Sequence, residues 1–130
     1  MKQLSKKNPY YIPHHKKMEL MHFCYQYQDW HKELNDISLI KRSSTEVVDG
    51  SRSNDELENV VIRRMSVIEK IEMVEKVAEL TDPELKSYIL RGVTTKASYD
   101  NLRLMYGIPC CRNVYYDLYH KFFYILSYYR

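Results

Sequence analysis

The stretch SYDNLRLMYGIPCCRNVYYDLYHKFFYIL, residues 98–126, contains start and stop signals for two helices joined by a short turn. Ser98 is a favourable N-cap for a first short helix, because its hydroxyl accepts a hydrogen bond from an unpaired backbone N–H. Gly107 stands where a left-handed residue is needed, and Pro109 prevents the helix from continuing. A second helix is expected to begin near Cys110.

The second helix is amphipathic when its residues are spaced at about 100° each, which predicts that one side is buried. The apolar side consists of Cys111, Tyr115, Leu118, Phe122, Ile125 and Leu126. The opposite side carries Asn113, Tyr116, Asp117, His120 and Tyr124, with Arg112 and Lys121 at its edges. A short helix, a turn containing glycine and a second helix with a polar N-terminal half indicate a helix-turn-helix that reads the DNA major groove. An ordinary helical corner would show the same capping residues, so this alternative stays open.

The composition favours a helical globular protein. The chain has 130 residues, of which 45% are hydrophobic and 28% charged, values typical of a folded domain. Only three glycines are present, too few for many hairpin turns, and no alternating strand pattern occurs, so we expect an all-α fold. No apolar run is long enough to span a bilayer, and three cysteines argue against a disulfide framework. We therefore expect no membrane contact and a cytoplasmic location.

Charge is distributed unevenly along the chain. The excess of basic over acidic residues is +4 in residues 1–43, −4 in residues 44–80 and +3 in residues 81–130. Basic ends suit contact with nucleic-acid phosphates, but the net charge of +3 is small. A monomer would then bind DNA weakly at cellular salt, so a dimer or a second contact would be needed.

Three segments are expected from the pattern of polar and apolar residues. We expect residues 1–40 to form a basic arm followed by a small pair of helices. Residues 41–56 are expected to be a polar linker. Residues 57–130 predict a helical domain that contains the helix-turn-helix. Its long first helix, residues 57–80, repeats valine every seven residues, which is compatible with a homodimer seam. Further apolar residues widen this stripe, so packing within one chain is the competing interpretation.

No residue pattern indicates catalysis, a metal or a cofactor. Ligand types gather near the N-terminus at His14, His15, His22, Cys24 and His31. Their spacing does not match the paired ligands of a zinc site, and no phosphate-binding loop or hydrolase motif is present. We therefore expect a protein that is not an enzyme.

The C-terminal part resembles region 4 of sigma factors. The resemblance rests on a long helix, a helix opened by Asp-Pro-Glu at residues 82–84, and the motif formed by Ser98, Tyr99, Leu102, Gly107 and Ile108. The ending NVYYDLYHKFFYILSYYR, residues 113–130, is similar to late transcription regulators of the ArpU and RinA type from Firmicutes phages and prophages. The resemblance covers residues 57–130. It implies binding to double-stranded DNA near phage promoters, control of late genes and possible contact with RNA polymerase.

Roles for individual side chains follow from base and phosphate chemistry. Four residues are expected to read base edges: Arg112, Asn113, Tyr116 and His120. Three are expected to hold phosphates without reading sequence: Lys96, Arg103 and Lys121.

Two functions from other classes remain open. A DNA-packaging component similar to a small terminase subunit would also join a helix-turn-helix to oligomerising helices, and a ring of many subunits would distinguish it. A module whose tyrosine-rich helix binds RNA polymerase or a host defence protein would show no affinity for DNA even at low salt.

Overall fold

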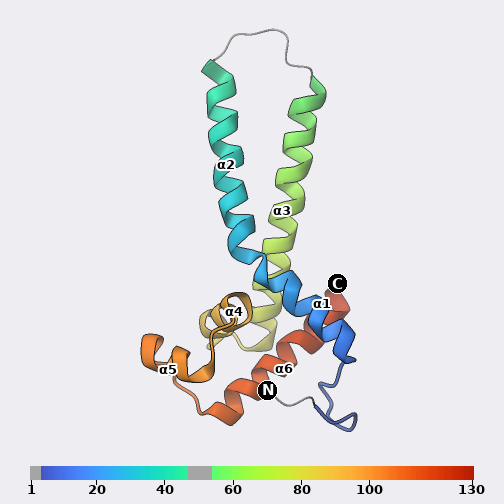
Figure 1. Cartoon of the computed structure of the whole chain (residues 1–130), viewed down its shortest axis with the longest axis vertical. Coiled ribbons are helices and arrows are strands. Elements are labelled where there is room, and N and C mark those ends of the chain that lie inside the picture. Colours follow the sequence, from blue (N-terminus) through green and yellow to red (C-terminus); the bar gives the residue numbers. More distant parts are fainter. Residues whose placement is uncertain (1–3, 47–53) are drawn as a thin grey trace. The chain divides into compact units, whose positions relative to one another are not determined.

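The computed structural model describes the backbone of residues 4–46 and 54–130, and the side chains of residues 4–36 and 56–130. Every regular element in these ranges is an α-helix, which confirms the all-α fold (Figure 1). The helices are α1 (His14–Tyr25), α2 (Tyr27–Glu46), α3 (Asn54–Thr81), α4 (Lys86–Thr95), α5 (Tyr99–Tyr106) and α6 (Arg112–Tyr129). No helix in the described ranges combines the length and the apolar content that crossing a bilayer requires.

The chain forms two compact units whose boundaries differ from the expected segments. Unit 1 contains the residues up to Gln26 together with Met73–Arg130, and unit 2 is Tyr27–Glu72. The expected N-terminal pair at 1–40 is therefore divided, because α1 packs against α4 and α6 in unit 1. The expected linker at 41–56 is shorter, since α2 continues to Glu46 and α3 begins at Asn54. Its middle, residues 47–53, lies outside the described residues.

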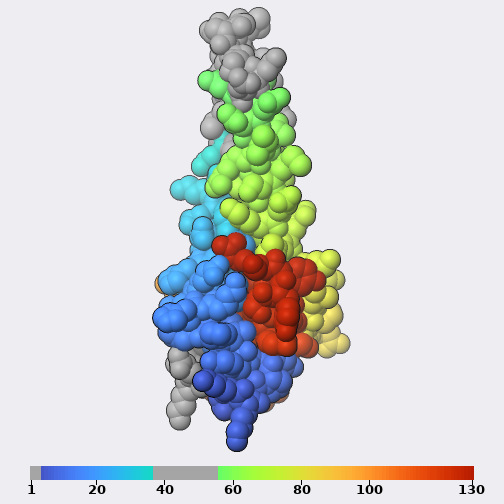
Figure 2. All heavy atoms as spheres, turned by 90° about the vertical axis from the view of Figure 1, so that its right-hand side faces the viewer, coloured from blue at the N-terminus to red at the C-terminus, as the bar shows by residue number. Residues whose placement is uncertain are grey.

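In unit 1, α6 is covered by both α1 and α4. Figure 2 views the face on which α1, in blue, adjoins the C-terminal end of α6, in red. Six residues of α6 are buried: Tyr115, Tyr119, His120, Phe122, Phe123 and Leu126. This stripe is shifted from the expected one: Tyr119, His120 and Phe123 are buried, whereas Leu118 and Ile125 are only half-buried. The shift follows from the packing of both α1 and α4 against α6. The position of Cys111 was wrongly expected: it is the exposed N-cap of α6 and not a core residue.

Unit 2 contains two helical segments that lie side by side and run in opposite directions, α2 and the first part of α3 (Figure 1). The guanidinium of Arg63 donates two hydrogen bonds to the carboxylate of Glu33, at 2.6 and 3.0 Å. The bond from Arg63 is the main reason why the pKa of Glu33 is lowered. Both side chains reach solvent, so the pair contributes little to stability.

The apolar stripe of α3 changes along the helix. Val67 and Ile71 are buried in unit 2, and Val74, Val77 and Ala78 are buried in unit 1. The N-terminal part instead exposes four large apolar side chains: Leu57, Val61, Ile62 and Met65. Packing within the chain therefore accounts for the C-terminal part of the seven-residue repeat, and the expected homodimer contact remains a prediction.

The two capping residues predicted for α5 are confirmed. Ser98 caps α5, and its hydroxyl accepts a hydrogen bond from the backbone N–H of Asn101 at 3.2 Å. Gly107 ends the same helix with φ of +64°, and its N–H donates to the carbonyl of Arg103 at 3.1 Å. Asp82 accepts hydrogen bonds from the N–H groups of Glu84 and Leu85, but the turn they form precedes α4.

Replacing Gly107 by alanine should lower the free energy of unfolding by about 1–2 kcal/mol. An L-residue at this left-handed φ is strained, whereas an added Cβ would meet no atom within 4 Å, so conformational strain is the whole cost. Urea denaturation of the variant would measure it. Gly107→Asn is the control and should lose less, because asparagine tolerates this conformation. Equal stability of wild type and Gly107→Ala would contradict the assignment.

Candidate nucleic-acid interface

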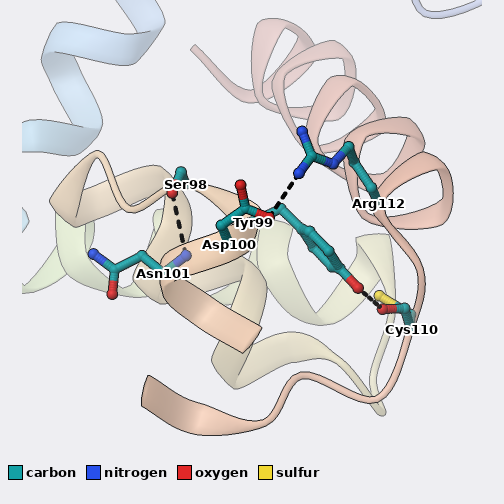
Figure 3. Close-up of polar contacts among 6 residues, drawn as sticks. All are labelled: Ser98, Tyr99, Asp100, Asn101, Cys110 and Arg112. Atoms are coloured by element: carbon teal, nitrogen blue, oxygen red, sulfur yellow. Dashed lines mark hydrogen bonds and ion pairs between the residues drawn. The ribbon is translucent and has the colours of Figure 1, made fainter. Parts of the chain in front are cut away.

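The turn between α5 and α6 is held by contacts from both helices (Figure 3). The hydroxyl of Tyr99, at the start of α5, donates a hydrogen bond to the carbonyl of Cys110 at 2.6 Å. The guanidinium of Arg112, the first residue of α6, donates to the carboxylate of Asp100 at 2.6 Å. Tyr99 is buried and Cys110 is half-buried, so their bond is partly shielded from water. The first turn of α6 is therefore tied to the first turn of α5.

Three of the expected base-reading residues reach solvent on the first two turns of α6. Arg112 and Asn113 are exposed, and Tyr116 is half-buried with its ring against Tyr115 at 5.1 Å. The ion pair of Arg112 with Asp100 is open to water, since both side chains are more than half exposed. Such a pair is weak, so Arg112 can exchange Asp100 for another acceptor at little cost.

The expectation for His120 is wrong. Its side chain is only 7% exposed, and its Nδ1 lies 3.2 Å from the ammonium nitrogen of Lys17 in α1. Burial, aided by the nearby Lys17 charge, lowers the pKa of His120 to about 4, and Asp117 opposes this shift. A neutral, buried histidine facing α1 cannot reach a base edge. The helical spacing placed it on the polar side of α6, but α1 covers that part of the helix.

The three expected phosphate contacts occupy different settings. Lys96 lies between α4 and α5 in a left-handed conformation, with φ of +61° and its ammonium 4.6 Å from the centre of the Tyr25 ring. Arg103 is exposed on α5, and Lys121 is half-buried on α6. Arg103 and the Arg112–Asn113 pair belong to the two helices that flank the same turn, whereas Lys121 lies two turns further along α6.

Sequence reasoning missed an apolar surface at the end of α5. Leu104 is 85% exposed and Met105 68% exposed, and Tyr106 and Val114 are also exposed. Arg91 of α4 donates a hydrogen bond to the hydroxyl of Tyr106 at 2.9 Å and lies 4.0 Å from the centre of its ring. The sequence contained a signal for this surface, because Leu104 and Met105 are consecutive apolar residues near the end of α5. A helix of eight residues cannot bury every side.

In comparisons with known proteins, no family model matches the chain, and neither a curated protein nor a solved structure gives a significant match.

The three thiols differ in burial: Cys24 is buried, Cys110 is half-buried and Cys111 is exposed. Cys24 is buried, and this burial raises its pKa to about 12. Burial also raises the pKa of Cys110, with smaller contributions from Cys111 and Asp82. No group of three or more potential ligands lies close enough to hold a metal within the described residues. The accessible polar groups of α5 and α6 are therefore the strongest candidates for a functional surface.

Proposed function

We propose that the chain is a sequence-specific DNA-binding regulator of phage genes, with the N-terminal half of α6 in the major groove. The observation that carries the proposal is that Arg112, Asn113 and Tyr116 all reach solvent on the first two turns of α6. They follow a turn held by the bond between Tyr99 and Cys110. A helix placed in this way presents its first residues to base edges. The resemblance to region 4 of sigma factors supports the same orientation.

Each of these side chains suits a different base. The planar guanidinium of Arg112 can donate two hydrogen bonds to guanine, and the amide of Asn113 can pair with adenine. Tyr116 can contact a thymine methyl group or donate a hydrogen bond. Asp117, exposed on the same surface, repels phosphate and suits either the amino group of cytosine or a protein partner. Asp100 holds Arg112 until guanine replaces it as the acceptor.

Paired variants test the proposal. Asn113→Ala should weaken binding to the specific site by about 1–3 kcal/mol and leave binding to unrelated DNA unchanged, since it removes a base contact. Arg103→Ala should weaken binding to both kinds of DNA alike, because a phosphate contact carries no sequence information. The site would first be found by recovering fragments of the source genome bound at about 0.1 M salt. Dissociation constants for that site and a scrambled duplex would then be measured. Equal losses on both duplexes for both variants would refute the assignment.

The exposed apolar residues Leu104, Met105 and Val114 favour a second candidate, a module that binds protein. RNA polymerase is the partner that a transcription regulator would contact with such a surface. Leu104→Gln, which adds no charge beside Arg103, should then weaken binding of purified RNA polymerase while leaving DNA affinity intact. If the wild-type chain binds polymerase but no DNA at low salt, this function replaces the first.

A further inference from the structure

A small cavity lies in unit 1 between the N-terminal arm, α1 and α6, away from the turn between α5 and α6. Its volume is about 50 Å³, and its lining includes Tyr10, Tyr11, His14, Lys17, His120 and Phe123. A single buried water needs a cavity of roughly 10–15 Å³, so this cavity has room for a group the size of a few waters. No aspartate or glutamate among the described residues lines it.

The N-terminal arm is folded over this cavity by its own hydrogen bonds. The side-chain oxygen of Asn8 accepts a hydrogen bond from the backbone N–H of Tyr10 at 2.9 Å. The backbone carbonyl of Asn8 accepts one from the backbone N–H of Tyr11 at 3.1 Å. The N–H of Asn8 donates to the carbonyl of Ser5 at 2.9 Å. These turns place Tyr10 and Tyr11 in the cavity wall. The arm from Leu4 onward is therefore part of the fold of unit 1.

Lys17 brings a positive charge to the cavity that no acid in the described residues neutralises. Its side chain is half-buried, and this burial lowers its pKa. Its ammonium contacts His120 Nδ1 at 3.2 Å and lies 5.9 Å from the centre of the Tyr119 ring. The adjacent Lys16, in contrast, pairs with Glu19 at 3.6 Å. Lys17 is therefore a half-buried cation without a neighbouring acid among the described residues, and its ammonium is available to pair with an anion in the cavity.

His120 supplies a second donor. Its Nδ1 accepts a hydrogen bond from the Lys17 ammonium. In the neutral ring the proton is therefore on Nε2, which can act as a donor. Among the described residues Nε2 has no hydrogen-bond partner, and the side chain, more than nine-tenths buried, lines the cavity. The Tyr115 hydroxyl is the only fully buried, unpaired polar side-chain atom among the described residues, so Nε2 is not sealed from solvent and can donate to a group that enters the cavity.

The start of α1 adds to the same electrostatic preference. His14, the first residue of α1, lines the cavity, and no acidic residue or capping side chain occupies the first turn. The backbone N–H groups of His14, His15 and Lys16 come before the first bond of the helix, which runs from Lys17 to Pro13. Such a helix end carries a partial positive charge that favours anions.

We propose that this cavity binds a small oxyanion of the phosphate class, held by the Lys17 ammonium and His120 Nε2. The proposal is independent of the proposed reading of DNA by α6. The same phosphate chemistry has two sources, free inorganic phosphate and a phosphate of the DNA backbone, and the experiment separates them.

The test measures phosphate and sulfate binding by isothermal titration calorimetry at constant ionic strength, with chloride as the replaced salt. Wild type should bind both oxyanions, and Lys17→Gln should weaken binding at least about tenfold, as the loss of a charge-assisted hydrogen bond predicts. Lys16→Gln is the matched control and should bind within about twofold of wild type, because Lys16 pairs with Glu19. No binding by wild type, or equal weakening in both variants, would overturn the proposal.

A second readout does not depend on how well the variants fold. In an NMR titration of the wild-type chain with phosphate, the amide signals of residues 10–17 and the ring signals of His120 should shift together. Shifts spread over all lysine-bearing surfaces would show non-specific charge attraction and contradict the site.

Competition identifies the source of the anion. If the cavity takes a backbone phosphate, a short DNA duplex should displace inorganic phosphate, and Lys17→Gln should reduce affinity for every duplex. If DNA leaves phosphate bound, the ligand is a free oxyanion. Asn113→Ala should leave phosphate binding unchanged in either case, so failure of the DNA proposal and failure of this one give different results.

Discussion

Replacing Gly92 by alanine should destabilise unit 1 by about 1–3 kcal/mol, the range for overpacking a filled core. Gly92 lies within α4, and a Cβ added there would clash with the hydroxyl oxygen of Tyr115 and stand 3.1 Å from ring atom Cζ. The Tyr115 ring cannot easily move away, because it is almost fully buried and Leu102 lies on the same side. The result would oppose the ordinary preference, since alanine is the better helix former by about 1 kcal/mol.

A double-mutant cycle isolates this contact. Tyr115→Phe removes the clashing oxygen, and alone it should change stability by less than about 0.5 kcal/mol, because that hydroxyl has no hydrogen-bond partner within the described residues. In the Tyr115→Phe background, Gly92→Ala should therefore cost at least about 1 kcal/mol less than in wild type. Urea midpoints at constant slope would give all four values. Ser87→Ala, at an exposed position of α4, is the control and should not destabilise. A Gly92→Ala variant as stable as wild type would refute the close approach.

Acid should destabilise unit 1 through His120. Burial, with a contribution from Lys17, lowers the pKa of His120 in the folded chain to about 4, below its ordinary value of 6.5. Between these two pH values the unfolded chain binds one proton more than the folded chain, so stability falls as pH falls from 6.5 towards 4. The slope approaches about 1.4 kcal/mol per pH unit, which gives a total loss of about 2–3 kcal/mol.

The His120→Asn variant separates this effect from the titration of carboxylates. Asparagine cannot be protonated in this range, and its side-chain oxygen can still accept from Lys17. Carboxyl groups such as Glu33 contribute equally to both proteins, so they cancel when the two unfolding free energies are subtracted. The difference should shrink as pH falls below 6.5 and become constant below about 4. If the unfolding free energies of the two proteins instead change with pH in parallel, the pKa of His120 is the same in the folded and unfolded chains, and the prediction is wrong.

Signals between residues close in sequence were predicted correctly. The Ser98 cap and the left-handed Gly107 both depend on hydrogen bonds that span three or four residues. The end of α3 at Thr81 lies one residue beyond the expected end at Leu80, and its start at Asn54 lies three residues before the expected start at residue 57. Local hydrogen bonding and backbone sterics decide such features before any packing occurs. The continuation of α2 to Glu46 was not expected, because its polar C-terminal residues resemble a linker.

The candidate interface was only partly predictable, because the spacing of residues within one helix does not show which other helices cover it. Helical spacing put Arg112, Asn113 and Tyr116 on the polar side of the first two turns of α6, and all three reach solvent there. It failed two turns later at His120, because α1 covers α6 there and Lys17 occupies the space beside the ring. Periodicity tells which residues share a side of a helix, but not how many neighbours that helix has.

The sequence by itself determined the all-α class, the ends of α5 and the polar start of α6, since these depend on propensities and hydrogen bonds within a single turn. Tertiary structure alone decided that α1 belongs with α6, that Gly92 must lack a side chain and that His120 is buried beside Lys17. Each of these depends on atoms that are distant in the chain, and Lys17 and His120 are 103 residues apart. Contacts over such separations follow from how the helices pack, and no periodicity within one helix encodes them.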